Sequence, residues 1–370
     1  MRGGWLLCAV VVGGCSGDGE GGGTDDGSSG SGGAVTSPGT TGQSATSGGP
    51  TSTAAMSSSG ETTATEPTGP TTSQPTGDGS SGSSGGESDF PDVDLTDPQL
   101  YEFELDPVEL DPTVEDAIAL QYAHLDTRAE PQGKLVFFLS GFTNTPAAWR
   151  NFGAHLAGYG FHVVEPHYAN DWSCDGSPDC NSNTRWEALI GEDHSPVIDI
   201  SRADSAEGRV VTILEHLDEV HPGGDWAFYL DGAGGLRYEH VIIAGISHGA
   251  SSSGLYATRR PFHRAVMHSG GWGNVDASTM TPVDVMFGLS HVADEQHAGH
   301  LNAWESAGLP GAPVVADTMK PPYGDSHRLI VQTPNGYPHC SVVVSGDSPV
   351  VDDEYVFDPA WRTMYGAPQL

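Results

Sequence analysis

Short apolar runs recur through the last two-thirds of the chain, and each has the length of a buried strand. The runs Lys134–Leu139 and His240–Ile246 contain almost no polar residues and end in glycine or small residues. Uninterrupted runs of this kind are typical of central parallel strands that are covered on both faces. Further strands are predicted at Ile118–Tyr122, Phe161–Pro166, Arg264–Ser269, Val283–Leu289 and His327–Gln332.

Segments with helical spacing separate these runs. The clearest is Ile200–Val220, where apolar residues recur every three to four positions and Pro-Gly-Gly ends the pattern. Helices are also predicted over Pro146–Gly158, from Ser247 to about Arg260, and over His297–Ala307. The stretch from Cys174 to about Pro196 is expected to be a long loop that roofs a site. Strands that alternate with helices predict the α/β class, with a mostly parallel sheet and helices on both faces.

The first quarter of the chain differs in composition. Residues 16–89 are almost entirely Gly, Ser, Thr, Pro and acidic residues, without apolar periodicity, so they are predicted to be a disordered linker before one folded domain at 90–370. The formal net charge is -35, and no basic residue lies between Arg2 and Arg128. This charge disfavours binding to nucleic acid, and it favours solubility.

Residues 1–15 have the pattern of an export signal: one arginine, a short apolar run and small residues. The run is too short to span a bilayer. Val12-Gly13-Gly14-Cys15 resembles a bacterial lipobox, in which Cys15 would be lipidated and the linker would tether the domain outside the cytoplasm. Ordinary cleavage without lipidation is the alternative.

The remaining cysteines fit an exported protein. Cys174 and Cys180 lie close together in a loop rich in Gly, Pro, Asp and Asn, so we interpret them as a disulfide. A zinc site is the rival interpretation, but no second ligand pair has matching spacing. Cys340 is left over and is expected to be a small buried apolar residue.

The sequence Gly245-Ile246-Ser247-His248-Gly249 follows an apolar run and precedes small residues that can begin a helix. This context suits a nucleophile elbow, a strained strand-to-helix turn that exposes a serine hydroxyl. The five-residue pattern is weak by itself, because Gly82–Gly86 also matches it inside a Ser/Gly tract. Only the copy at Ser247 has a strand before it and a helix after it.

Other chemically useful residues follow the predicted strands. In a parallel sheet reactive groups gather at the carboxyl ends of the strands. Gly141-Phe142 follows the first central strand, Ser247 the elbow strand, Asp294 a later strand, and His339 the last one. A serine hydroxyl needs an adjacent base, and histidine suits that task at neutral pH. Asp276 and Asp317 compete with Asp294 for the carboxylate role.

From Lys134 to His339 the chain resembles the α/β-hydrolase superfamily. The resemblance rests on the elbow, on the Gly141 loop and on the order Ser, Asp, His along the chain. More narrowly, it is similar to secreted bacterial hydrolases of unassigned substrate. The resemblance implies that Ser247 is the nucleophile, His339 the general base and Asp294 the residue that orients it. It also implies an oxyanion hole made by the backbone N–H groups of His248 and of a residue near Phe142. Superfamily esterases often carry His-Gly in that loop, where this chain has Ser140-Gly141, so the second donor is open.

Other clusters have competing interpretations. His291, His297 and His300 with Asp294 are a candidate metal set, and solvated histidines are the alternative. Asp347, Asp352 and Asp353 could bind Ca²⁺ but lack EF-hand spacing, which favours a charged loop. Four tryptophans are expected to pack in the core, and the alternative is that they line a pocket for the acyl group. They are Trp149, Trp172, Trp186 and Trp272. We expect no metal and no cofactor.

Together these features predict a membrane-tethered, extracytoplasmic serine hydrolase that acts on small-molecule or lipid carboxylic esters through an acyl-enzyme. A serine peptidase of the same fold is one alternative. A binding protein on an inactive hydrolase scaffold is the other.

Overall fold

The computed structural model describes residues 89–370 except 175–176, 178 and 334–335. The predicted signal with Cys15 and the predicted linker up to residue 88 therefore lie outside the described residues. Within the described part of the chain, no helix combines the length and apolarity needed to cross a membrane.

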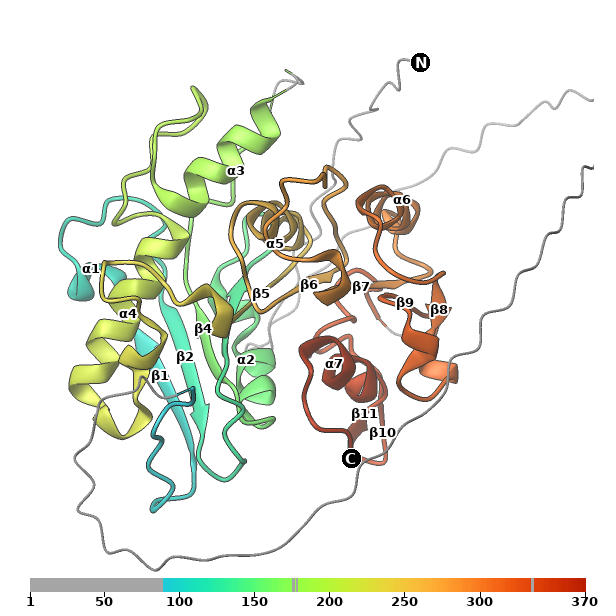
Figure 1. Ribbon diagram of the computed structural model, residues 1–370, viewed down its shortest axis with the longest axis horizontal. Coiled ribbons are helices and arrows are strands. Elements are labelled where there is room, and N and C mark those ends of the chain that lie inside the picture. Colours follow the sequence, from blue (N-terminus) through green and yellow to red (C-terminus); the bar gives the residue numbers. More distant parts are fainter. Residues whose placement is uncertain (1–88, 175–176, 178, 334–335) are drawn as a thin grey trace, which may run out of the picture. The chain divides into compact units, whose positions relative to one another are not determined.

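A nine-stranded sheet forms the centre of the domain, in the order β1-β2-β4-β3-β5-β6-β7-β9-β8 (Figure 1). All pairs from β4 to β8 are parallel, whereas β2 pairs antiparallel with both β1 and β4. The strands are β1 Leu100–Leu105, β2 Gln121–Asp126, β3 Leu135–Leu139, β4 His162–Glu165, β5 Val241–Ile246, β6 Arg264–His268, β7 Met286–His291, β8 Val314–Val315 and β9 Arg328–Val331. A separate hairpin pairs β10 Val350–Val351 with β11 Glu354–Tyr355.

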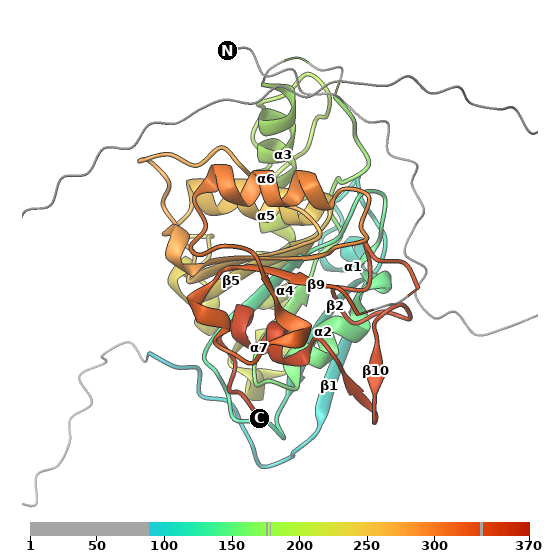
Figure 2. The same ribbon diagram turned by 90° about the vertical axis from the view of Figure 1, so that its right-hand side faces the viewer.

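Helices cover both faces of the sheet, as Figure 2 shows with α5 and α6 on one side and α2 and α7 on the other. The helices are α1 Pro107–Leu110, α2 Arg150–Ala157, α3 Cys180–Ile190, α4 Ala206–Val220, α5 His248–Arg259, α6 His297–Ala307 and α7 Asp358–Tyr365. Two apolar clusters fill the spaces between helices and sheet. Consecutive residues of β5, Ile242 and Ile243, belong to different clusters, because side chains alternate along a strand. The predicted α/β class is confirmed.

Several element boundaries differ from the predicted ones. The helix expected from Ile200 begins at Ala206, where the Ser205 side chain accepts a hydrogen bond from the Gly208 amide. The strand expected at Val283 begins at Met286, after a 3₁₀ turn. In both cases the apolar pattern begins several residues before the helix cap or the first strand pairing.

The prediction that Cys174 to Pro196 is a loop is wrong, because α3 occupies Cys180–Ile190. Its sequence is polar, yet most of its residues are buried. Glu187 explains part of this, since its carboxylate accepts backbone hydrogen bonds from His194, Ser195 and Ile200 of the segment that follows. A helix stabilised by such contacts has no clear amphipathic signal in its sequence.

Strand β1 and helix α7 were also not predicted. β1 alternates acidic residues with Tyr101, Phe103 and Leu105 within an acidic segment, and it lies at the sheet edge. In α7, Trp361 is fully buried and its indole N–H donates to the Val342 carbonyl at 2.7 Å. Cys340, expected to be buried, is completely inaccessible and belongs to the same apolar cluster as Trp361.

Candidate active site

Ser247 lies between the end of β5 and the start of α5, as the elbow pattern predicts. Its backbone has φ 56° and ψ -116°, a conformation that non-glycine residues rarely adopt. The Ser247 amide donates to the His268 carbonyl of the neighbouring strand at 2.9 Å, which fixes the turn to the sheet. Strain of this kind persists only where surrounding contacts hold it, and it is concentrated at functional sites.

The two glycines of the motif are required by close backbone approach. A Cβ on Gly249 would lie 2.1 Å from the Leu139 carbonyl oxygen, and a Cβ on Gly245 would lie 2.6 Å from backbone atoms of Gly249. Both distances are far below van der Waals contact. The elbow therefore packs α5 directly against the ends of β3 and β5, and only glycine fits at these positions.

His248 follows Ser247 directly, and the loop that carries Phe142 touches the elbow. A Cβ placed on Gly141 would be 3.4 Å from the Ser247 Cβ, so the loop after β3 touches the elbow. The rings of Phe142 and His248 are 6.0 Å apart. His248 is the first residue of α5, so its N–H has no acceptor within the helix. The Phe142 N–H likewise makes no hydrogen bond to another residue of the described chain.

Asp294 and His339 form a buried pair. His339 Nδ1 and Asp294 Oδ2 are 2.7 Å apart, although the two residues come from loops after different strands. The other oxygen of Asp294 accepts the Gln296 amide at 2.8 Å. Burial acts to raise the pKa of Asp294, but the hydrogen bond and charge of His339 and the Gln296 amide outweigh it, so this pKa lies below its usual value.

The Ser247 hydroxyl makes no hydrogen bond to another residue in the described ranges, so its link to His339 stays a prediction. Indirect packing connects the two parts of the site. The Trp304 indole donates to the Gly270 carbonyl at 2.8 Å, and a Cβ on Gly270 would lie 2.6 Å from the Ser247 carbonyl oxygen. Trp304 also stacks on His300, which is 6.1 Å from the His339 ring.

The competing carboxylates have other partners. Asp276 is exposed and accepts hydrogen bonds from Ser278. Asp317 accepts the backbone amides of Gln332 and Thr333, which stabilises the chain just after β9. Of the three candidates, Asp294 is the one that pairs with His339.

His300, which the sequence placed with Asp294 in a candidate metal set, lies next to this pair. Its Nδ1 is 3.8 Å from Asp294 Oδ2 and 3.0 Å from the Ser290 hydroxyl. Burial lowers the pKa of His300 to about 4, so this imidazole is neutral at physiological pH. The signal in the sequence was that His300 lies six residues after Asp294, which is why both were placed in the candidate metal set.

The structure brings together only two members of the candidate metal set, Asp294 and His300, and adds His339 to them. Asp294, His300 and His339 place one ligand atom each within 4.8 Å of one another. His291 does not join them, because its nitrogens contact the Thr333 carbonyl and the Ala293 amide. His297 instead contacts the Ser290 hydroxyl. Asp347, Asp352 and Asp353 do not form a metal-ligand cluster among the described residues. Asp352 and Asp353 form the β10–β11 turn with positive φ, which aspartate tolerates.

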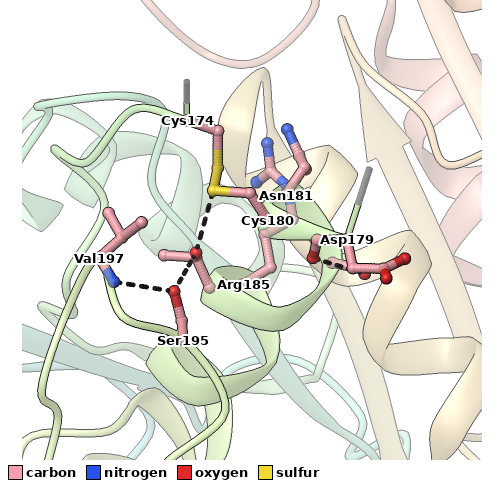
Figure 3. The surroundings of a disulfide bond; sticks show 9 residues. Cys174, Asp179, Cys180, Asn181, Arg185, Ser195 and Val197 are labelled. Atoms are coloured by element: carbon pink, nitrogen blue, oxygen red, sulfur yellow. Dashed lines mark hydrogen bonds between the residues drawn. A yellow bond between two sulfur atoms is a disulfide. The ribbon is translucent and has the colours of Figure 1, made fainter. Parts of the chain in front are cut away.

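The Cys174–Cys180 disulfide is present, with a Cα–Cα distance of 5.9 Å (Figure 3). Cys180 is the first residue of α3. The bond therefore ties the start of this helix to the preceding loop. A disulfide also fits an extracytoplasmic location.

Arg185 of α3 contacts the first turn of α5, the helix that follows Ser247. Its guanidinium donates to the His248 carbonyl and to the Ser252 hydroxyl, both at 2.8 Å, and lies over the Trp172 ring. Burial lowers the pKa of Arg185 to about 10. The His248 ring is also buried, 4.8 Å from Trp172, and burial lowers its pKa well below the usual value. The contacts of Arg185 could not be read from the sequence, because α3 was not predicted.

The four tryptophans have different surroundings. Trp149 and Trp186 are core residues, and Trp172 packs against His248. Trp272 lines a cavity of about 290 Å³ that none of the three predicted catalytic residues lines. The lining residues are Ser182, Leu255, Thr258, Arg259, Trp272, Asn274, Asp276, Ser278 and Thr279.

The chain was compared with family models, with curated proteins and with solved structures. No family model matches the chain, and no curated protein matches it. Among solved structures, a candidate dienelactone hydrolase from Klebsiella pneumoniae aligns with a TM-score of 0.34 and 15% identity, over 72% of this chain and 98% of that one. The mostly parallel sheet, the helices on both faces and the elbow at β5 show that this chain has the α/β-hydrolase fold.

Proposed function

We propose that the protein is a serine hydrolase that cleaves carboxylic esters, with Ser247 as nucleophile, His339 as base and Asp294 as the carboxylate that orients it. The observation that carries this proposal is the buried 2.7 Å contact between His339 and Asp294, in a fold whose elbow presents Ser247. An ionised Asp294 accepts the Nδ1 proton of His339 and leaves the Nε2 lone pair free for a hydroxyl proton.

The reaction would run in two steps. The Ser247 oxygen attacks the ester carbonyl carbon while His339 Nε2 takes the hydroxyl proton. The resulting oxyanion accepts hydrogen bonds from the His248 and Phe142 amides, which the backbone already fixes in place. His339 then returns the proton to the leaving alcohol, and water hydrolyses the acyl-enzyme with His339 again acting as base.

The test uses two readouts on the full chain: hydrolysis of p-nitrophenyl butyrate and labelling by a fluorophosphonate. Ser247→Ala should abolish both, because the probe needs an activated serine oxygen. Ser251→Ala is the matched control, one helical turn further along α5. Both readouts should stay within about twofold of the wild type in that control, because Ser251 is half-buried and its hydroxyl makes no hydrogen bond to another described residue. Full labelling of Ser247→Ala would overturn the assignment.

A serine peptidase would share this acyl-transfer chemistry. Parallel panels of peptide and ester substrates distinguish the two, since the peptidase proposal requires cleavage of amide bonds. An inactive binding protein would give neither hydrolysis nor labelling in the wild type.

We also propose that Cys15 is lipidated and that the acidic segment after it tethers the domain to a membrane outside the cytoplasm. The lipobox resemblance at Val12–Cys15 supports this proposal, and the Cys174–Cys180 disulfide fits it. Replacing Cys15 by serine should move the protein from the membrane fraction to the aqueous fraction. Equal membrane association of both proteins would contradict lipid anchoring.

A further inference from the structure

We propose that Asp294, His300 and His339 form an inhibitory binding site for Zn²⁺, in which the metal takes over the carboxylate and imidazole of the proposed triad. Two imidazole nitrogens and one carboxylate oxygen are a ligand set that zinc uses in proteins, with water as the fourth ligand. The inhibitory consequence rests on the proposed function, whereas the binding itself does not.

The distances fit a tetrahedral ion after small side-chain shifts. Zinc bonds of about 2.0–2.1 Å place neighbouring ligand atoms about 3.3 Å apart. The Asp294 Oδ2 lies 2.7 Å from His339 Nδ1 and 3.8 Å from His300 Nδ1, which brackets that spacing. One ligand atom from each of the three residues lies within 4.8 Å of those of the other two. The same carboxylate oxygen therefore already lies near both imidazole nitrogens.

The surroundings allow His300 to turn its Nδ1 to a metal. At present this nitrogen is 3.0 Å from the Ser290 hydroxyl. Ser290 is completely buried, but it would not lose its last partner, because His297 Nδ1 also lies 3.0 Å from its oxygen. The His339 side chain is 11% exposed, so one ligand can be reached from solvent.

Metal binding at His339 Nδ1 would block the base by exchanging its tautomer. A neutral imidazole carries one proton, which lies on Nδ1 when Asp294 accepts it. Coordination needs the Nδ1 lone pair, so the proton moves to Nε2. The Nε2 lone pair that would accept the Ser247 proton is then used, and the serine is not activated.

Isothermal titration calorimetry of Zn²⁺ into the full chain tests the site without any need for activity. The wild type should bind one more zinc ion than His300→Gln. His297→Gln is the matched control from the same helix. A Gln amide can still hydrogen-bond the Ser290 hydroxyl that His297 contacts, so this variant should bind zinc as the wild type does. Ser247→Ala should also bind normally. Mg²⁺ should give no such difference, because it prefers oxygen ligands.

Inhibition is measured as the rate of fluorophosphonate labelling, relative to the zinc-free rate of each variant. Zinc should slow labelling of the wild type reversibly, with recovery after a chelator is added. Loss of a partner that only supports a metal ligand costs about 10–100-fold in affinity. The half-inhibiting concentration should therefore rise at least about tenfold in His300→Gln and stay unchanged in His297→Gln.

The outcomes separate the two proposals. Equal zinc binding by the wild type and a folded His300→Gln overturns the site, and His339→Gln gives a second test of the same ligand set. Binding that depends on His300 but does not slow labelling overturns the inhibitory role. A wild type that neither hydrolyses esters nor reacts with the probe overturns the proposed function, and the calorimetric comparison then still decides the metal site.

Discussion

Asp294→Asn separates the chemical role of the carboxylate from its structural one. The introduced amide has nearly the same shape, and its oxygen can still accept the Gln296 amide that Asp294 accepts now. Toward His339, however, an amide NH₂ donates rather than accepts. The His339 Nδ1 would then need to be the acceptor, which places the ring proton on Nε2, where it blocks proton uptake from Ser247.

The size of the effect follows from the geometry. The imidazolium formed in the transition state has its Nδ1 2.7 Å from Asp294 Oδ2. At an effective dielectric constant of about 20, two unit charges at that separation interact by about 6 kcal/mol. A triad Asp→Asn change of this kind lowers kcat by about 10⁴-fold, or about 5.5 kcal/mol. The two figures agree, so we expect a loss of about four orders of magnitude.

The assay is kcat for p-nitrophenyl butyrate at pH 7–9, with thermal unfolding recorded for each variant. Asp276→Asn is the control, because Asp276 is exposed and its carboxylate accepts hydrogen bonds from Ser278 of the same loop. It should retain wild-type kcat. If a folded Asp294→Asn variant keeps kcat within tenfold of the wild type at pH 7, Asp294 does not orient His339 and the reasoning fails.

Three further predictions concern the fold around the site. Gly249→Ala should lower stability by about 1–3 kcal/mol, because its Cβ would lie 2.1 Å from the Leu139 carbonyl oxygen; an unchanged melting temperature would contradict this. Replacing Cys174 and Cys180 by serine should lower the free energy of unfolding in urea by about 2 kcal/mol, given the short loop they close; equal urea midpoints would show that the bond does not stabilise the fold. Burial lowers the pKa of His268 from 6.5 to about 3 in the folded protein, so its contribution to stability is complete above pH 6.5 and is lost as the pH falls. His268→Gln should therefore lose stability about 1.4 kcal/mol less steeply per pH unit than the wild type between pH 6 and 5, and parallel curves would refute this.

The predictions that succeeded came from patterns that a single segment carries. The runs of β3 and β5 are apolar throughout, and only a strand covered on both faces buries such a run without a polar partner. The elbow is also local, because Gly245 and Gly249 flank Ser247 at fixed spacing. Helix α3 was not predicted from such a pattern, because its polar side chains are buried by contacts with residues later in the chain. Glu187 is one of them.

The sequence by itself determined the α/β class, the elbow at Ser247 and the order in which the candidate residues follow their strands. It could rank Asp294 above Asp276 and Asp317 only by position along the chain. The tertiary structure shows that, of the three, Asp294 is the one that pairs with His339, and it brings His300 to the same carboxylate. The physical reason is that strand periodicity is local, whereas contacts between loops depend on the order and register of the strands across the whole sheet.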